Sequence, residues 1–223
     1  PGLADRFDVM AREVENIPGT QLTPDHALKL AAVLEPLMAD PEIDGAVVIQ
    51  GTDTLDEISY LVSLLLPAPK PIVFTGAMKG QGELYQDAAG NIFGAAQTAA
   101  RRGLRGVLVY MNQLIFSAAD VEKFHSNRMD AFQSFRGPVG AVENLTVQIW
   151  RQPEQAETHP VRSLTARVPI IKCYAGMDDL LIRAAVDAGC DGLVVECFGS
   201  GNVQPAAMEA LKEARRRGMA VVI

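Results

Sequence analysis

The sequence has 223 residues, with 20 Lys and Arg against 27 Asp and Glu, and a formal net charge of −7. A hydrophobic fraction of 48% and a charged fraction of 21% are typical of a folded globular protein and exclude intrinsic disorder. The acidic balance is evidence against a nucleic-acid partner, because phosphate binding needs clustered Lys and Arg. No apolar stretch approaches the roughly 20 residues that a membrane-spanning helix needs, so we expect no membrane partner. Three cysteines, an odd number without a C-x-x-C pair, suit a reducing compartment, so we expect a cytoplasmic protein.

Short apolar runs alternate with helical patterns along the first part of the chain. Continuous apolar runs of this length are typical of parallel strands that are covered on both faces. We expect such strands at 46–49, 71–74 and 107–110. We expect helices at 25–38, 55–66 and 87–102, and a long strand or a hairpin at 139–150. Strand–helix alternation predicts an α/β fold with an open, doubly wound, flavodoxin-like parallel sheet.

The composition changes after residue 150. The segment 151–168 contains two prolines and no apolar periodicity, which is typical of a linker between domains. A second strand–helix alternation follows, so the sequence predicts an N-terminal α/β domain at 1–150 and a smaller α/β domain at 169–223. In that second domain we expect strands at 170–174, 192–197 and 220–223 and helices at 178–188 and 205–218.

Three polar clusters fall where open α/β sheets bind ligands, beyond the carboxyl ends of the strands. They are Gly51-Thr52-Asp53-Thr54, Thr75-Gly76-Ala77-Met78-Lys79, and the segment from Ser117 to Lys123. Taken alone, the first cluster is more typical of a helix N-cap than of a catalytic site. A lysine such as Lys123 is, by the same standard, more typical of a solvated surface charge.

Several site classes lack their sequence signature. Gly76, Gly80 and Gly82 do not form the G-x-G-x-x-G fingerprint of dinucleotide binding, which disfavours a nucleotide-binding protein. The three histidines are scattered without metal-ligand spacing, and no G-x-S-x-G nucleophile elbow occurs. We therefore expect neither a cofactor nor a metal. The three cysteines, Cys173, Cys190 and Cys197, lie in apolar contexts that are typical of buried core thiols.

The clusters together are more specific than any one of them. Gly51-Thr52-Asp53-Thr54 is followed by Gly76-Ala77-Met78, by Asp120-Val121-x-Lys123, and then by the motifs at 131–134 and 137–140. Ile17-Pro18-Gly19-Thr20-Gln21 precedes them, and Gly199-Ser200-Gly201-Asn202 lies near the end of the chain. In this order and with these spacings, the sequence resembles the two-domain L-asparaginase/glutaminase family over nearly its whole length.

The resemblance implies an amidohydrolase that converts L-asparagine to L-aspartate and ammonia through a threonine acyl-enzyme, and it leaves L-glutamine open as a substrate. It implies catalytic roles for Thr52, Asp53 and Lys123. A hydroxyl attacks an amide only if a base takes its proton, and lysine is a base only when neutral. Asp53 could bind the substrate ammonium, orient the lysine, or do both. Backbone N–H groups near Thr52 are candidate oxyanion donors.

The resemblance also implies a substrate-binding set. Thr20 and Gln21 match positions that hold the α-carboxylate and α-amine of the substrate, and Thr52 and Asp53 contact the substrate as well. Ala77 matches a position whose carbonyl accepts from the carboxamide. Asn202 matches a residue that reaches the active site of a neighbouring subunit, so we expect a homodimer or a homotetramer.

The sequence departs from the family in several places. Gln50 stands where the family usually has His, Lys79 replaces an arginine, and 87–91 differs from a D-G-P-x-N pattern. The family begins with a strand that ends in T-G-G-T-I and carries the primary nucleophile, followed by a lid with a tyrosine, and this sequence contains neither. The resemblance therefore predicts that the chain as given is incomplete at both ends. The alternative hypothesis is a non-catalytic remnant that binds or senses an amino acid.

Overall fold

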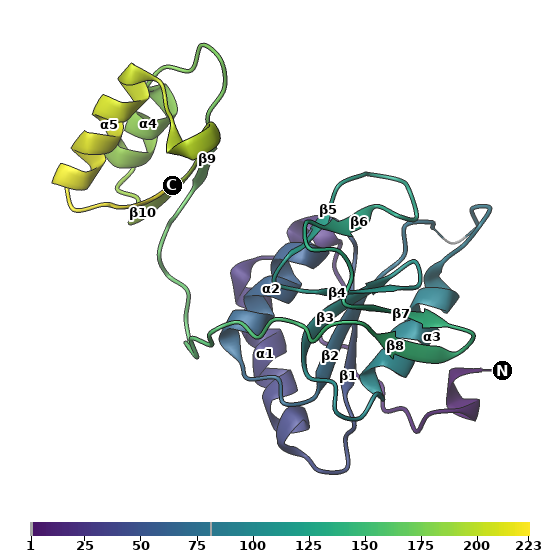
Figure 1. Ribbon diagram of the computed structural model, residues 1–223. Coiled ribbons are helices and arrows are strands. Elements are labelled where there is room, and N and C mark those ends of the chain that lie inside the picture. Colours follow the sequence, from purple (N-terminus) through teal and green to yellow (C-terminus); the bar gives the residue numbers. More distant parts are fainter. Residues whose placement is uncertain (1, 81) are drawn as a thin grey trace. The chain divides into compact units, whose positions relative to one another are not determined.

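The computed structural model describes residues 2–80 and 82–223 (Figure 1). The chain divides into two compact units, Pro1–Ser163 and Leu164–Ile223. The division falls inside the segment 151–168 that the sequence predicts as a linker, and the exact domain limits stay a prediction. Pro1, with which the expected N-terminal domain begins, lies outside the described residues.

The N-terminal unit is built on a six-stranded sheet with the order β1-β2-β3-β4-β7-β8. Its strands are β1 (Ala46–Ile49), β2 (Pro71–Thr75), β3 (Gly106–Met111), β4 (Leu114–Ser117), β7 (Gly140–Glu143) and β8 (Thr146–Ile149). Strands β1 to β3 pair in parallel, as the apolar runs predict. A separate two-stranded ribbon pairs β5 (Val121–Lys123) with β6 (Phe132–Ser134) in antiparallel fashion.

Helices cover both faces of this sheet, and the predicted α/β fold is confirmed. The helices are α1 (Pro24–Ala39), α2 (Leu55–Leu65) and α3 (Ala88–Ala99). Helices α1 and α2 lie on one face and α3 lies on the other (Figure 1). Successive strand residues point to opposite faces, so Val107 and Val109 pack under α1 and α2 while Leu108 packs under α3. The core is therefore split into two layers by the sheet.

The second half of the sheet is antiparallel, which the apolar runs did not predict. Strand β4 returns along β3 through a two-residue turn in which Asn112 and Gln113 have φ values of 49° and 68°. The predicted 139–150 segment is a hairpin, β7 and β8, joined by Asn144 and Leu145 at φ values of 48° and 63°. Two successive residues with positive φ form the turn that matches strand twist. Neither turn contains the Asn-Gly pair that marks such turns in a sequence. The apolar runs alone therefore did not predict both hairpins.

The C-terminal unit contains a three-stranded parallel sheet with the order β11-β10-β9. Its elements are β9 (Ile170–Lys172), α4 (Leu180–Asp187), β10 (Gly192–Glu196), α5 (Pro205–Arg216) and β11 (Ala220–Val222). All five were predicted, with ends that differ by a few residues. Helices α4 and α5 bury Ile182, Ala207 and Leu211 against the strands. Arg215 and Arg216 occupy the last turn of α5, where cations are favoured by the helix dipole.

Helix α3 packs directly onto the ring of Tyr110 in β3. A Cβ atom added at Gly94 would lie 2.0 Å from the ring and hydroxyl atoms of Tyr110, which is only 3% exposed. Burial also raises the pKa of Tyr110 to about 12. Gly94 is therefore required for close packing of the helix on the sheet.

Replacing Gly94 by alanine should lower the free energy of unfolding by about 2–3 kcal/mol, because a buried aromatic ring and the sheet would have to shift. Gly90→Ala is the matched control on the same helix, since an added Cβ there meets nothing within 4 Å. This control should leave stability unchanged or raise it by up to about 1 kcal/mol. Urea denaturation of both variants measures the difference, and equal midpoints would contradict the packing assigned to Gly94.

Within the residues that the structure describes, no helix is both long enough and apolar enough to cross a membrane.

Candidate active site

The predicted catalytic residues meet beyond the carboxyl ends of β1 and β2. Thr52 and Asp53 lie in the loop between β1 and α2, and Lys123 is the last residue of β5. The Lys123 Nζ donates to Thr52 Oγ1 at 2.9 Å and to Asp53 Oδ1 at 3.0 Å. The fold thus brings Lys123 to two neighbouring side chains that lie about 70 residues earlier in the sequence.

Lys123 is not the solvated surface lysine that its position alone suggested. Its side chain is 13% exposed, whereas the side chain of Asp53 is 58% exposed. A largely buried stem holds the amine between one hydroxyl and one carboxylate. Since a neutral amine has one lone pair and two N–H groups, this arrangement allows it to accept a proton from the hydroxyl and donate to the carboxylate.

The Thr52–Thr54 loop does not behave as a simple helix cap. Thr54 occupies the N-cap position of α2, but its side chain makes no capping hydrogen bond. Its hydroxyl donates instead to the carbonyl of Gly19 at 2.9 Å. The hydroxyl of Thr52 faces Lys123. The polar side chains of this loop therefore serve long-range contacts.

The hydrogen bond from Thr54 also positions the predicted substrate loop. Gly19 begins the short helix η2 (Gly19–Gln21), and a Cβ added there would lie 3.2 Å from the carbonyl oxygen of Gly51. The two backbones are thus in direct contact. The side chains of Thr20 and Gln21 follow immediately and are exposed beside the loop that carries Thr52.

The turn after β2 packs against Thr52 from another side. A Cβ added at Gly76 would lie 2.5 Å from the Gln50 carbonyl oxygen and 3.0 Å from Thr52 Cγ2, so only glycine fits there. This close approach places Ala77, the next residue, beside the Thr52 loop. The structure therefore brings Thr20, Gln21 and Ala77 into the neighbourhood of the three catalytic candidates.

Asp87 and Asn91 hold the turn after β2 in place. The Asp87 carboxylate accepts from the backbone N–H groups of Met78 and Lys79, each at 3.0 Å. The buried Asn91 amide donates to the Gly76 carbonyl and to Asp87, each at 3.0 Å. Although 87–91 departs from the family pattern, its aspartate and asparagine support the backbone around Ala77.

Asp56 is a residue of this site that the sequence did not indicate. Its carboxylate accepts from the backbone N–H of Lys123 at 2.9 Å, across 67 residues. An acidic residue in a first helical turn is ordinarily explained by the helix dipole alone. Here the contact ties the start of α2, which follows the Thr52 loop, to the strand that carries Lys123.

Asn202 follows the short helix η3 (Gly199–Gly201) in the C-terminal unit, where its side-chain amide donates to the Gly199 carbonyl at 2.8 Å. Its predicted role in the site of a neighbouring subunit stays a prediction. Among residues 2–80 and 82–223, no group of three or more His, Cys, Asp and Glu side chains could hold a metal ion.

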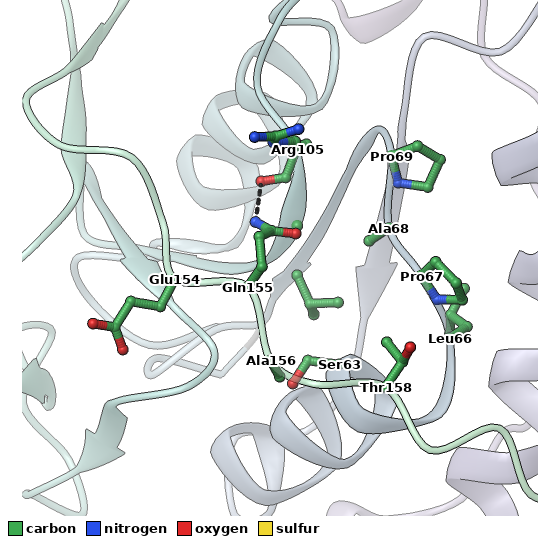
Figure 2. A pocket seen from close by; sticks show the side chains of 12 residues that line it. Ser63, Leu66, Pro67, Ala68, Pro69, Arg105, Glu154, Gln155, Ala156 and Thr158 are labelled. Atoms are coloured by element: carbon green, nitrogen blue, oxygen red, sulfur yellow. Dashed lines mark hydrogen bonds between the residues drawn. The ribbon is translucent and has the colours of Figure 1, made fainter.

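A separate cavity of about 430 Å³ lies at the opposite edge of the sheet (Figure 2). It is lined by the residues that precede β2 and β3 and by the chain at 154–158. The dashed line in Figure 2 marks the hydrogen bond from the Gln155 amide to the Arg105 carbonyl, at 3.4 Å. Because the catalytic candidates follow the carboxyl ends of the strands, this cavity is distinct from the candidate active site.

Comparison with known proteins agrees with the order of the motifs. The family model described as asparaginase, N-terminal, matches residues 1–155, and the glutaminase/asparaginase C-terminal domain matches residues 167–223. The chain belongs to the asparaginase family. The family membership that the motifs predicted is thereby confirmed.

Curated relatives within the asparaginase family match nearly all of the chain. The L-asparaginase of Bacillus licheniformis is 34% identical over 93% of this chain and 65% of its own length. The L-asparaginase 2 of Escherichia coli K12 is 33% identical over 100% of this chain and 66% of its own length. The glutaminase-asparaginase of Pseudomonas aeruginosa is 29% identical over 100% and 64%. The chain thus spans just under two thirds of the length of these relatives.

Proposed function

We propose that this protein is an amidohydrolase that releases ammonia from the side-chain amide of L-asparagine, with L-glutamine as a second candidate substrate. The observation that carries the proposal is the contact of Lys123 Nζ with both Thr52 Oγ1 and Asp53 Oδ1. In a member of the asparaginase family, this contact joins a potential base to a hydroxyl at the carboxyl edge of the sheet, where such folds bind ligands.

The proposed chemistry begins with proton transfer. Neutral Lys123 accepts the Thr52 hydroxyl proton, and its N–H remains available to the Asp53 carboxylate, which fixes the direction of the lone pair. In exchange, Thr52 Oγ1 takes the proton of the attacking threonine hydroxyl, so Thr52, Lys123 and Asp53 together activate attack on the amide carbon and give an acyl-enzyme with a threonine ester. The proton then passes to the departing nitrogen, which leaves as ammonia, and water hydrolyses the ester to the free carboxylate.

The family resemblance assigns the ester to a threonine of a T-G-G-T-I segment, which this sequence does not contain. We therefore assign Thr52, together with Lys123 and Asp53, to the set that activates the attack. The backbone N–H groups of the Thr52 loop, just before α2, are the proposed oxyanion donors.

Substrate binding is assigned to the residues gathered around Thr52. Thr20 and Gln21 would hold the α-carboxylate and α-amine, and the exposed carboxylate of Asp53 could pair with the substrate ammonium. The Ala77 carbonyl would accept from the carboxamide N–H. The packing of Gly19 on Gly51 and of Gly76 on Thr52 supports these assignments, because it sets both loops against the catalytic loop.

Ammonia release by the protein expressed from its complete coding sequence tests the proposal. Coupled to glutamate dehydrogenase, the assay should show turnover of L-asparagine, and the ratio of kcat/KM for L-asparagine and L-glutamine sets the substrate preference. Tight binding of L-aspartate without any turnover of either amide would contradict the enzyme and favour the non-catalytic amino-acid-binding alternative.

The assembly and location of the protein are also proposals. We infer a homodimer or homotetramer, because Asn202 is assigned to the active site of a neighbouring subunit, and we place the protein in the cytoplasm. Sedimentation equilibrium measures the oligomeric state, and fractionation of the native organism measures the location of the protein.

A further inference from the structure

Two free cysteines of the C-terminal unit, Cys173 and Cys197, directly follow the neighbouring strands β9 and β10. In the parallel pairing of β9 with β10, Ile171 faces Val195 and Lys172 faces Glu196, and the same register continued by one residue sets Cys173 opposite Cys197. The ladder continues to this point, because the Cys173 N–H donates to the Glu196 carbonyl at 2.8 Å. In a parallel ladder, the N–H of a residue donates to the carbonyl of the residue before its partner. The bond to Glu196 is therefore the one expected when Cys173 pairs with Cys197.

Both thiols lie on the same face of the sheet. Ile171 and Cys173 are buried in the core of the C-terminal unit, as is Val195, and Cys197 packs against the same core. Since side chains alternate along a strand, residues two apart point the same way. Cys173 is 6% exposed and Cys197 is partly exposed. The Cys197 residue is thus more exposed to solvent than Cys173.

The spacing of neighbouring strands suits a disulfide. Paired strands lie about 4.8 Å apart, and disulfides join Cα atoms that are about 4.4–6.8 Å apart. We propose that Cys173 and Cys197 form a thiol–disulfide exchange site that takes an oxidised low-molecular-weight thiol, such as glutathione disulfide, and closes to a reversible intramolecular disulfide. The proposal does not depend on the amidohydrolase function.

The exchange balances in two steps. The Cys197 thiolate attacks glutathione disulfide, whose S–S bond breaks, and one glutathione leaves with a proton. Cys173 then attacks Cys197 Sγ in the mixed disulfide, the protein S–S bond forms, and the second glutathione leaves with the other proton. Two protein thiols are oxidised and one glutathione disulfide is reduced to two thiols.

The pair lies at the base of two loops that contact each other. One loop begins at Tyr174, whose carbonyl accepts from the Gln204 amide, and the other begins at Phe198. Phe198 N–H donates to the Asn202 carbonyl at 3.0 Å. A disulfide would therefore join the two strand ends from which the Asn202 loop and its neighbour emerge.

Oxidation followed by peptide mapping tests the proposal. Burial, followed by the neighbouring Cys173 thiol, raises the pKa of Cys197, so thiolate is scarce at neutral pH. The full protein is therefore incubated with glutathione disulfide near the ordinary thiol pKa of about 8.5. Cleavage after Lys, Arg and Glu separates Cys173, Cys190 and Cys197 into peptides 173–183, 184–196 and 197–209.

We expect a crosslink between the Cys173 and Cys197 peptides that dithiothreitol removes. Cys190→Ser should keep this crosslink, and Cys197→Ser should abolish it while leaving the protein folded by circular dichroism. Wild-type protein in which Cys173 and Cys197 carry separate glutathione adducts, pair with other cysteines, or stay reduced after prolonged oxidation would overturn the proposal. Because the readout is covalent, it is unaffected by whether the protein turns over asparagine.

Discussion

Replacing Lys123 by methionine should lower kcat for ammonia release from L-asparagine by roughly a thousandfold, the range typical of a lost general base. Methionine keeps an unbranched apolar stem but removes the amine that contacts Thr52 Oγ1 and Asp53 Oδ1. The substrate would still find its other contacts, so KM should change much less than kcat. Steady-state kinetics of the full protein measures both quantities.

Lys79→Met is the matched control for that experiment. Lys79 follows the turn beside Ala77, and its side chain is 26% exposed and paired only loosely with Glu83 at 3.9 Å. We expect its kcat to stay within a few-fold of the wild-type value. If Lys123→Met retained near-normal turnover, the role of Lys123 as the base would be wrong, whatever the control did.

Thr52→Ala should lower kcat by at least about a hundredfold. The variant loses the hydroxyl of Thr52, which is the only hydroxyl that contacts Lys123 Nζ in the described part of the chain. Thr52→Ser keeps a hydroxyl on the same carbon and should recover much of the activity, within about tenfold of wild type. Stability should fall little, since Thr52 is only partly buried.

The comparison of alanine with serine separates chemistry from packing. A methyl group of Thr52 lies near Gly76, so both variants lose the same contact with that turn. Equal loss of activity in the two would show that the methyl group matters and the hydroxyl does not, which would remove Thr52 from the catalytic set.

The strand and helix order was predictable because it depends on local properties of the chain. The apolar runs at 46–49, 71–74 and 107–110 are β1, β2 and β3, extended by one residue at some ends. The antiparallel half of the sheet was only partly predictable. Its turns at Asn112-Gln113 and Asn144-Leu145 adopt positive φ without glycine, and residues other than glycine signal this conformation weakly.

The catalytic candidates were named from ordered motifs, but their environment was not in the motifs. Nothing local distinguishes Lys123 from a surface lysine, and Asp56 is an unremarkable acid in a first helical turn. Their mutual contact depends on the packing of the β5–β6 ribbon against the start of α2. Residues 67 positions apart leave no periodic signal in a single sequence.

By itself, the sequence determined the α/β class, the order of the helices and parallel strands, and the family, because these depend on hydrophobic periodicity and on residue types at fixed spacing. Tertiary structure alone decided that Lys123 is largely withdrawn from water, that Asp56 holds its backbone, and that Gly19 and Gly76 press two loops against Thr52. The physical reason is that burial and hydrogen-bond partners arise from packing between distant segments. The same holds for Cys173 and Cys197, which directly follow the paired strands β9 and β10, where the Cys173 N–H donates to the Glu196 carbonyl.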